Sequence, residues 1–170
     1  MKIFLIGFMG SGKTTVGKKM ANGLSYDYFD LDHFIEQKEK KSVRKIFEIM
    51  GEAYFREQES KYLRTISDDK NCVISTGGGL PCYNNNMDYM NNNGLTVYLK
   101  MKPEHLFSRL KNGRKNRPLI KDKNDQELFQ YIVDKLNERE FFYQKSRVVV
   151  DGFNLNMNDL LEKIRSYITQ

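Results

Sequence analysis

The sequence has few of the residues that build metal and disulfide sites: its 170 residues include two cysteines, two histidines and no tryptophan. Cys72 and Cys82 bracket a glycine run, and their spacing fits neither a zinc knuckle nor a CxxC redox pair. We expect a buried small hydrophobic residue at Cys72 and a free thiol at Cys82. Because only His33 and His105 offer imidazole ligands, a transition-metal site is not expected.

Long apolar runs are also missing, since no segment approaches the ~20 apolar residues that span a bilayer. The apolar run Ile3–Ile6 is too short for a signal peptide and leads directly into a functional motif that cleavage would destroy. We therefore expect no membrane partner and a cytoplasmic location. The sequence has no internal repeat and no linker, so a single domain is predicted over residues 1–170.

Positive charge exceeds negative charge only slightly: the sequence has 28 lysines and arginines and 22 aspartates and glutamates, which gives a net charge of +6. The basic residues are spread along the chain rather than gathered in one arm, which argues against a nucleic-acid partner. An enzyme that binds nucleotide phosphates and a carboxylate also benefits from a basic surface. Charge alone leaves open both a kinase and a nucleotide-binding regulatory or RNA-associated protein.

Five apolar runs alternate with segments of helix length. The runs are almost continuously apolar, which is typical of parallel strands buried on both faces. The predicted strands are Ile3–Phe8, Tyr28–Leu31, Cys72–Thr76, Thr96–Met101 and Val148–Asp151. The predicted helices are Lys13–Leu24, Val43–Met50, Glu52–Ser67, Pro103–Asn112, Gln126–Tyr143 and Met157–Ile168, with Pro103 in a first turn and Asn156 as an N-cap. This alternation predicts a doubly wound α/β domain with right-handed crossovers.

A phosphate-binding loop is predicted at Gly7–Thr15, where the chain satisfies G-x-x-x-x-G-K-[ST] at every fixed position, after a strand and before a helix. Glycines allow the backbone angles that turn successive N–H groups toward phosphates. Lys13 offsets the phosphate charge, and the Thr14 hydroxyl is suited to ligate Mg²⁺. The residues expected to bind ATP here are Gly10, Ser11, Gly12, Lys13, Thr14 and Thr15.

Two aspartates, Asp30 and Asp32, follow the second predicted strand at the edge where open α/β sheets place ligands. Side chains separated by one residue on a strand point the same way. One carboxylate is then suited to hold waters on Mg²⁺, and its neighbour to accept a hydrogen bond from a substrate hydroxyl. The alternative is that Asp32 caps the N-terminus of a helix, which explains only one of the two aspartates.

Two further segments have residues suited to a small polyhydroxy acid. Arg56 and Glu59, at i and i+3 of a predicted helix, can pair and hold the guanidinium in place for a carboxylate; a solvated salt bridge is the alternative. Thr76–Gly79 follows the third strand, and its three glycines favour a close approach of backbone to ligand over a plain turn.

Two polar stretches remain. Arg114–Leu119 predicts a mobile lid that brings a cation onto the transferring phosphoryl group, with Arg117 the best candidate and a solvated loop the alternative for Arg114 and Lys115. The runs Asn84–Asn86 and Asn91–Asn93 flank a short predicted helix, Met87–Met90. We interpret these asparagines as compositional drift rather than chemistry.

Together these motifs resemble the shikimate kinase family in order and spacing over nearly the whole chain. The residues that carry the resemblance are Gly7–Thr15, Asp30–Asp32, Gly51–Glu59, Thr76–Gly79, Arg117–Leu119, Asn137–Arg139 and Tyr143. The resemblance implies a P-loop NTPase fold of the nucleoside monophosphate kinase type, with a parallel sheet in the order 2-3-1-4-5. It also implies a shikimate-binding region at about 33–61 and a lid at about 112–124.

The activity that the resemblance implies is ATP-dependent, Mg²⁺-requiring phosphorylation of the shikimate 3-hydroxyl, a step in aromatic amino-acid biosynthesis. By position in the motifs, Asp32 would receive the reacting hydroxyl, as a base or only as an orienting group. Arg56 and Arg139 would bind the substrate carboxylate, while Gly78 and Gly79 would offer backbone contacts.

On the donor side the resemblance implies that Lys13 and Arg117 act on the ATP phosphates, with Arg117 reaching over from the lid. Mg²⁺ would be served by Thr14 and, through water, by Asp30. Shikimate and ATP are then the expected partners of a monomer.

The segment Asp151–Asn156 departs from the family's adenine-binding loop, so the adenine contacts stay open. Phe153 either stacks on the base or fills the core, and either Arg109 or Arg114 approaches the adenine. Another small-molecule kinase on this scaffold, such as a gluconate or nucleotide kinase, is the nearest alternative. The triple glycine and the carboxylate-binding arginines favour the polyhydroxy acid.

Overall fold

The computed structural model describes residues 1–66, 70–113, 117 and 119–169. In chain order the described elements are β1 (Lys2–Ile6), α1 (Lys13–Leu24), β2 (Asp27–Asp30), α2 (Leu31–Glu39), α3 (Val43–Thr65), β3 (Cys72–Ser75), the 3₁₀ turn η1 (Leu80–Cys82), α4 (Asn86–Asn93), β4 (Leu95–Lys100), α5 (Pro103–Lys111), α6 (Asp125–Tyr143), β5 (Val148–Asp151) and α7 (Met157–Ile168).

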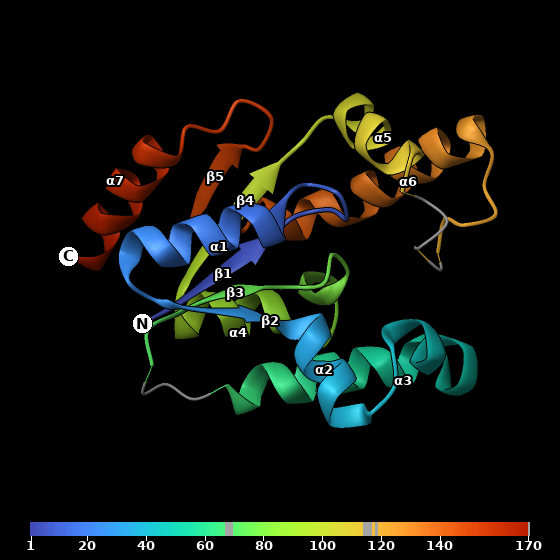
Figure 1. The fold of residues 1–170 in the computed structure, drawn as a ribbon, viewed down its shortest axis with the longest axis horizontal. Helices are drawn as coiled ribbons and strands as arrows, with labels where there is room; N and C mark the ends of the chain where they lie inside the picture. The colour runs from blue at the N-terminus through green and yellow to red at the C-terminus, as the bar shows by residue number, and fades with distance from the viewer. Residues whose placement is uncertain (67–69, 114–116, 118, 170) are drawn as a thin grey trace.

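The strands described form one parallel sheet in the order β2-β3-β1-β4-β5, which confirms the order that the resemblance implied. β1 lies in the middle, where Ile3 is in register with Val73 of β3 and Leu95 of β4. The strand arrows in Figure 1 point toward the side where α2, α3 and α5 extend beyond the sheet. Loops that follow the strands therefore meet at one edge of the sheet.

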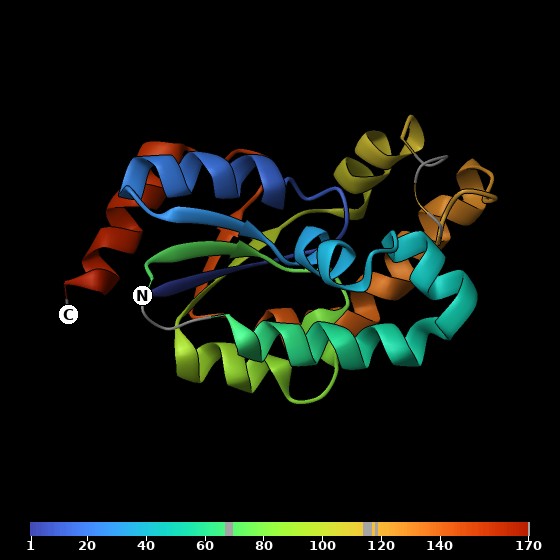
Figure 2. The ribbon, with the colours of Figure 1, turned by 60° about the horizontal axis from the view of Figure 1, so that its bottom comes forward.

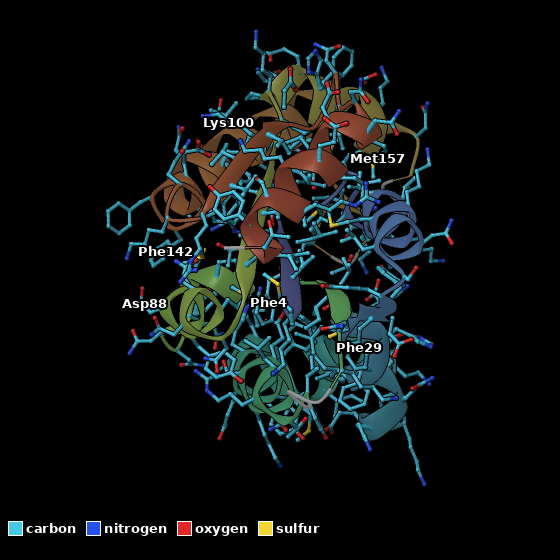
Figure 3. The ribbon with its side chains drawn as sticks, turned by 90° about the vertical axis from the view of Figure 1, so that its left-hand side faces the viewer. Phe4, Phe29, Asp88, Lys100, Phe142 and Met157 are labelled. Carbon is cyan, nitrogen blue, oxygen red and sulfur yellow. The ribbon has the colours of Figure 1, made fainter. Side chains whose placement is uncertain are left out.

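The two faces of the sheet pack against different helices. Ile3 and Leu5 of β1 lie in one core with residues of α1 and α7, whereas Phe4 and Ile6 lie in the other with residues of α3, α4 and α6. Figure 2 shows α1 and α7 over one face and α3 and α4 under the other, and Phe4 lies among the interior side chains in Figure 3. Ile3–Ile6 of β1 are fully buried, in agreement with the continuous apolar run from which the strand was predicted.

Helix α2 is missing from the predicted elements, because it follows β2 with no loop between them. Asp30 ends β2 and also caps α2, with its Oδ1 accepting a hydrogen bond from the backbone N–H of His33 at 3.3 Å. Asp32 therefore lies in the first turn of a helix, and the prediction that both aspartates project from one strand is wrong. The alternative that Asp32 is the N-cap is also wrong, since the cap is Asp30.

Other boundaries differ by small amounts. The two predicted helices Val43–Met50 and Glu52–Ser67 form α3, which is broken at Gly51 (φ 83, ψ 170), and the predicted end Ser67 lies outside the described residues. α4 is longer than predicted because it includes the second asparagine run. Pro103 opens α5 and Asn156 caps α7, as predicted.

Two further features concern the cysteines and the hydrophobicity of the helices. Cys72 is buried in β3, as predicted, and Cys82 is partly buried in η1. None of the described helices is long and apolar enough to cross a membrane.

Candidate active site

The glycine-rich loop between β1 and α1 has the backbone conformation that its sequence predicts. Gly10 and Gly12 have φ angles of +81° and +98°, in the region that residues with a Cβ rarely adopt. Gly12 is the N-cap of α1, so the helix begins at Lys13 with its free N–H groups at the loop. Such a terminus favours bound phosphate.

The ammonium group of Lys13 lies inside this loop. Its Nζ donates to the carbonyl oxygens of Gly7 at 2.7 Å and Phe8 at 3.0 Å. Burial lowers the pKa of Lys13 to about 8, an effect that Asp32 opposes and Arg117 adds to. With a pKa of about 8, Lys13 is still mostly protonated at neutral pH and can offset the charge of a bound phosphate.

Asp32 has the environment of a reactive carboxyl. Its Oδ1 is buried and has no hydrogen-bond partner among the residues that the structure describes. Burial and the neighbouring Asp30 raise the pKa of Asp32 to about 6, against the opposing charges of Lys13 and Arg56. A carboxylate with a pKa near neutrality and a free oxygen is suited to accept a proton from a bound hydroxyl.

Arg56 is held in place by two glutamates of its own helix. Its Nε and Nη2 donate to Glu52 Oε1 at 3.2 and 2.9 Å, and its Nη1 donates to Glu59 Oε2 at 2.5 Å. A guanidinium has five N–H groups. Within the described part of the chain these bonds use three of them, which leaves one N–H on each terminal nitrogen for a ligand. Two such donors match the two oxygens of a carboxylate.

The Arg56–Glu59 pair is buried, so the alternative of a solvated salt bridge is wrong. Glu59 has no exposed surface and Arg56 is only 7% exposed. Burial raises the pKa of Glu59, while the adjacent Arg56 opposes this effect. Burying such a pair costs desolvation energy, so the pair is weak evidence for stability. Here its bond fixes the direction of the guanidinium.

The triple glycine after β3 allows charged side chains to approach the backbone closely. A Cβ on Gly79 would lie 2.6 Å from Arg56 Nη2, and one on Gly78 would lie 3.3 Å from Arg139 Nη1. A Cβ on Gly77 would overlap Glu59 and lie 3.1 Å from Asp32 Oδ1. The glycines are thus needed for steric reasons, which a plain turn does not explain.

Arg139 reaches the arginine-lined cavity from α6, whereas Arg56 reaches it from α3. Its side chain is buried, and its Cζ lies 5.4 Å from the centre of the Phe8 ring. One turn later, the hydroxyl of Tyr143 donates to the Gly78 carbonyl at 2.5 Å. α6 is therefore tied directly to the glycine segment.

Two neighbouring cavities contain nearly all of these groups. The phosphate-loop cavity, about 320 Å³, is lined by residues that include Gly10, Gly12, Lys13, Thr14 and Asp30. The arginine cavity, about 220 Å³, is lined by residues that include Phe47, Phe55, Arg56, Glu59, Gly79 and Arg139. Both cavities share Met9, Asp32, Gly77, Gly78 and Arg117. Asp32 and Arg117 therefore lie where a group can pass from one cavity to the other.

Some predicted site residues lie at the margin or outside the description. Thr14 and Thr15 are exposed at the start of α1, and Ser11 is buried. Arg114, Lys115 and Pro118 of the predicted lid lie outside the described residues. Among the described residues, no cluster of three or more histidine, cysteine or acidic side chains is suited to hold a metal ion. Magnesium usually needs only one or two protein carboxylates beside phosphate oxygens, and Asp30 and Thr14 line one cavity as such a set.

The predicted adenine region is partly defined. Arg109 donates through Nη1 to the carbonyls of Gly10 and Ser11, at 3.3 and 3.1 Å, so it lies on the phosphate loop. Phe153 is half exposed and stacks on His105 with ring centres 3.7 Å apart, which excludes the alternative that it fills the core.

Sequence reasoning missed the contribution of the first asparagine run. Asn86 is fully buried, and Asn84 and Asn86 both donate to Ser60 Oγ, at 2.8 and 2.9 Å. The interpretation of these two residues as compositional drift is therefore wrong. The sequence carries no local signal for them, because their partner on α3 is more than twenty residues away along the chain.

Comparison with known proteins gives one consistent family. A family model described as shikimate kinase matches residues 9–169. The shikimate kinase of Phocaeicola vulgatus is 46% identical over 146 residues, which cover 86% of this chain and 83% of the relative. The shikimate kinase of Azobacteroides pseudotrichonymphae is 45% identical and covers 96% of both chains.

Solved structures agree with these relatives. The crystal structure of shikimate kinase from Bacteroides thetaiotaomicron matches with a TM-score of 0.90 and 37% identity, over 100% of this chain and 99% of that one. Shikimate kinase from Acinetobacter baumannii in complex with shikimate matches with a TM-score of 0.86 and 34% identity, over 99% and 92% of the two chains. A deoxyadenosine kinase from M. mycoides, at 23% identity and a TM-score of 0.58, shares the fold.

Proposed function

Because this chain belongs to the shikimate kinase family, we propose that its two cavities hold the two substrates of that reaction, ATP in the phosphate-loop cavity and shikimate in the arginine cavity. The observation that carries this proposal is the shared wall. Asp32 and Arg117 line both cavities, so the acceptor hydroxyl and the γ-phosphoryl group would meet beside them. The product would be shikimate 3-phosphate with ADP.

On the acceptor side, the shikimate carboxylate would lie between Arg56 and Arg139. The N–H groups of Arg56 that remain after its bonds to Glu52 and Glu59 suit a two-oxygen anion. The backbone of Gly78 and Gly79 would contact the ring hydroxyls. A cavity with two arginines, a carboxylate and open backbone matches an anionic polyhydroxy ring in kind.

Asp32 would accept a hydrogen bond from the reacting 3-hydroxyl through its unpartnered Oδ1. With a pKa of about 6, it is ionised at neutral pH and still basic enough to take the proton as the O–P bond forms. A loose phosphoryl-transfer transition state needs little base catalysis. Orientation of the hydroxyl is therefore the larger part of its contribution.

On the donor side, the N–H groups of the loop Gly10–Thr15 and the ammonium of Lys13 would hold the β- and γ-phosphates. Arg117 would approach the same phosphates from the lid, at about 112–124. Thr14, and Asp30 through water, would hold Mg²⁺, which neutralises phosphate charge when bound. Each cation lowers the cost of the negative charge that spreads over the transferring group.

The wider setting is also part of the proposal. Residues 1–170 would act as one kinase domain, with a shikimate-binding region at about 33–61, as a monomer in the cytoplasm, where ATP is supplied. Of the two adenine candidates, Arg109 lies on the phosphate loop and would approach the base from there, whereas Arg114 lies outside the described residues.

A substrate panel tests the assignment. Purified protein with ATP and Mg²⁺ should release ADP when shikimate is added, with no comparable turnover on gluconate or AMP. Equal or faster turnover on either alternative would refute the acceptor assignment. Phosphorus NMR of the product, which distinguishes the ring positions, checks that the 3-hydroxyl is the acceptor.

A further inference from the structure

We propose that a hydrogen-bond hub, made of the buried Ser60 and Asn86 and the exposed Asn84, positions Arg56 to receive the substrate carboxylate. The inference rests on the proposed role of Arg56, and it makes the three hub members positioning residues for shikimate recognition. None of them is among the lining residues of either cavity, so an effect on the substrate would be indirect.

The hub is bonded to the backbone of Arg56 itself. Ser60, one turn later on α3, donates from Oγ to the Arg56 carbonyl at 2.9 Å. Asn84 Nδ2 donates to Ser60 Oγ at 2.8 Å and lies 3.3 Å from the same carbonyl. Asn86 Nδ2 donates to Ser60 Oγ at 2.9 Å. Both asparagines thus converge on one hydroxyl that is bonded to Arg56.

The other side of the hub is bonded to the glycine segment. Asn86 Nδ2 also donates to the carbonyl of Leu80, the residue after Gly79, at 3.0 Å. Arg64 of α3 completes the connection, with Nη1 donating to Asn86 Oδ1 at 2.8 Å and Nη2 to the Asn84 carbonyl at 3.1 Å. The hub therefore fixes the distance between α3 and the segment that follows β3.

That distance decides where the guanidinium of Arg56 lies. The guanidinium is so close to Gly79 that a Cβ there would be 2.6 Å from Nη2. Its Cζ also lies 5.0 Å from the centre of the Tyr83 ring, on the same segment. Glu52 and Glu59 orient the side chain from within α3, and the hub bonds α3 to the segment that carries Gly79 and Tyr83. A shift of ~1 Å at such a contact can cost about 100-fold in rate.

Asparagine also suits the backbone conformation at Asn84 and Asn85. Asn84 and Asn85 have φ angles of 50° and 53°, in the left-handed region that asparagine adopts more readily than most residues. The turn brings two side-chain amides to one hydroxyl. Directional hydrogen bonds to the buried Ser60 and Asn86 specify a single arrangement, which an apolar contact of the same size does not.

The test removes hydrogen bonds of the hub while the Arg56 side chain is left unchanged. Ser60→Ala and Asn86→Ala should each lower kcat/KM for shikimate by about fivefold, the size expected for one net hydrogen bond. The kcat/KM for ATP should stay unchanged, and Ser60→Thr, which keeps the hydroxyl, should restore most of the loss. Asn93→Ala is the matched control, because Asn93 is exposed and donates to the carbonyl of Tyr89 on its own helix. Circular dichroism should show that each variant is folded at the assay temperature.

A double-mutant cycle with Arg56→Lys separates positioning from general stability. Lysine keeps the charge but not the planar fork, so loss of the hub should add little in that background. An equal loss from Ser60→Ala in both backgrounds, or an equal loss for ATP, would overturn the inference. If Arg56→Lys weakens shikimate use while both hub variants leave it unchanged, the inference alone fails. If Arg56→Lys itself has no effect, the proposed role of Arg56 fails, and the inference with it.

Discussion

The phosphate-loop cavity and the arginine cavity share a wall but are built in different ways. In the first, the groups proposed to bind phosphate come from one continuous segment, Gly7–Thr15, and are mainly backbone N–H groups and one lysine. Its other lining residues include Asp30, Asp32 and the glycine segment. The second takes side chains from α2, α3 and α6 and backbone from the glycine segment. One cavity therefore depends on local conformation, and the other on how distant elements pack.

The largest expected effect comes from the first cavity. Lys13→Ala should lower kcat by about 100- to 1000-fold, because it removes a positive charge aimed at the transferring phosphoryl group. The KM for shikimate should change little. Steady-state kinetics with both substrates varied measures this, with Lys19→Ala, an exposed lysine of the same helix, as the control.

Removal of an arginine from the second cavity should act mainly on binding. Arg139→Ala should raise the KM for shikimate by about 10- to 100-fold, the range expected for hydrogen bonds to a charged group, with a smaller change in kcat. Arg165→Ala, an exposed arginine of α7 that donates to the Gly23 carbonyl, is the control. If Lys13→Ala and Arg139→Ala gave the same kinetic defect, the division between the cavities would be wrong.

A methyl group at Gly79 should disturb the second cavity alone. The backbone there is ordinary helical (φ −88, ψ −21), so the effect of Gly79→Ala comes from overlap with the Arg56 guanidinium. We expect kcat/KM for shikimate to fall by about tenfold, the size of a modest overpacking penalty, and kcat/KM for ATP to be unchanged.

Gly23→Ala is the matched control for that substitution, because its Cβ would lie 2.6 Å from Leu161 Cδ1, far from both cavities. It should alter thermal stability without a selective effect on shikimate. A selective loss of shikimate use in this control would show that the Gly79 result is not local.

The smallest effect is a pH dependence that separates the cavities. The pKa of Asp32 is raised to about 6, so its carboxylate prevails above that pH and kcat/KM for shikimate should fall about tenfold per pH unit below it. The pKa of Lys13 is lowered to about 8, so its ammonium prevails below that pH and kcat/KM for ATP should fall above it. Profiles of kcat/KM from about pH 5 to 9, roughly the range that spans both pKa values, measure the fall with shikimate on the acid side and the fall with ATP on the alkaline side. Asp32→Asn should abolish the acid limb of the residual activity, and an unchanged acid limb would exclude Asp32 as its source.

The two cavities also differ in how far the sequence predicted them. The positive φ angles at Gly10 and Gly12 and the start of α1 at Lys13 follow from a motif whose parts are neighbours in the chain. The helical position of Asp32 was not predicted, because a strand that runs straight into a helix leaves no loop signal at Leu31. The burial of Arg56 and Glu59 was not predicted either, since i and i+3 spacing is the same on an exposed and a buried helix face.

The sequence by itself determined the five buried strands and the phosphate loop, because apolar patterning and glycine conformation act over a few residues, while the order of the strands in the sheet came from the family resemblance. The family resemblance added the identities of the acceptor residues. Only the tertiary structure decided that the glycines at 77–79 make room for Arg56, Glu59 and Arg139, and that Asn84 and Asn86 hold α3 through Ser60. The physical reason is that these contacts join residues far apart in the chain, so the sequence around one residue does not indicate which distant residue it will contact.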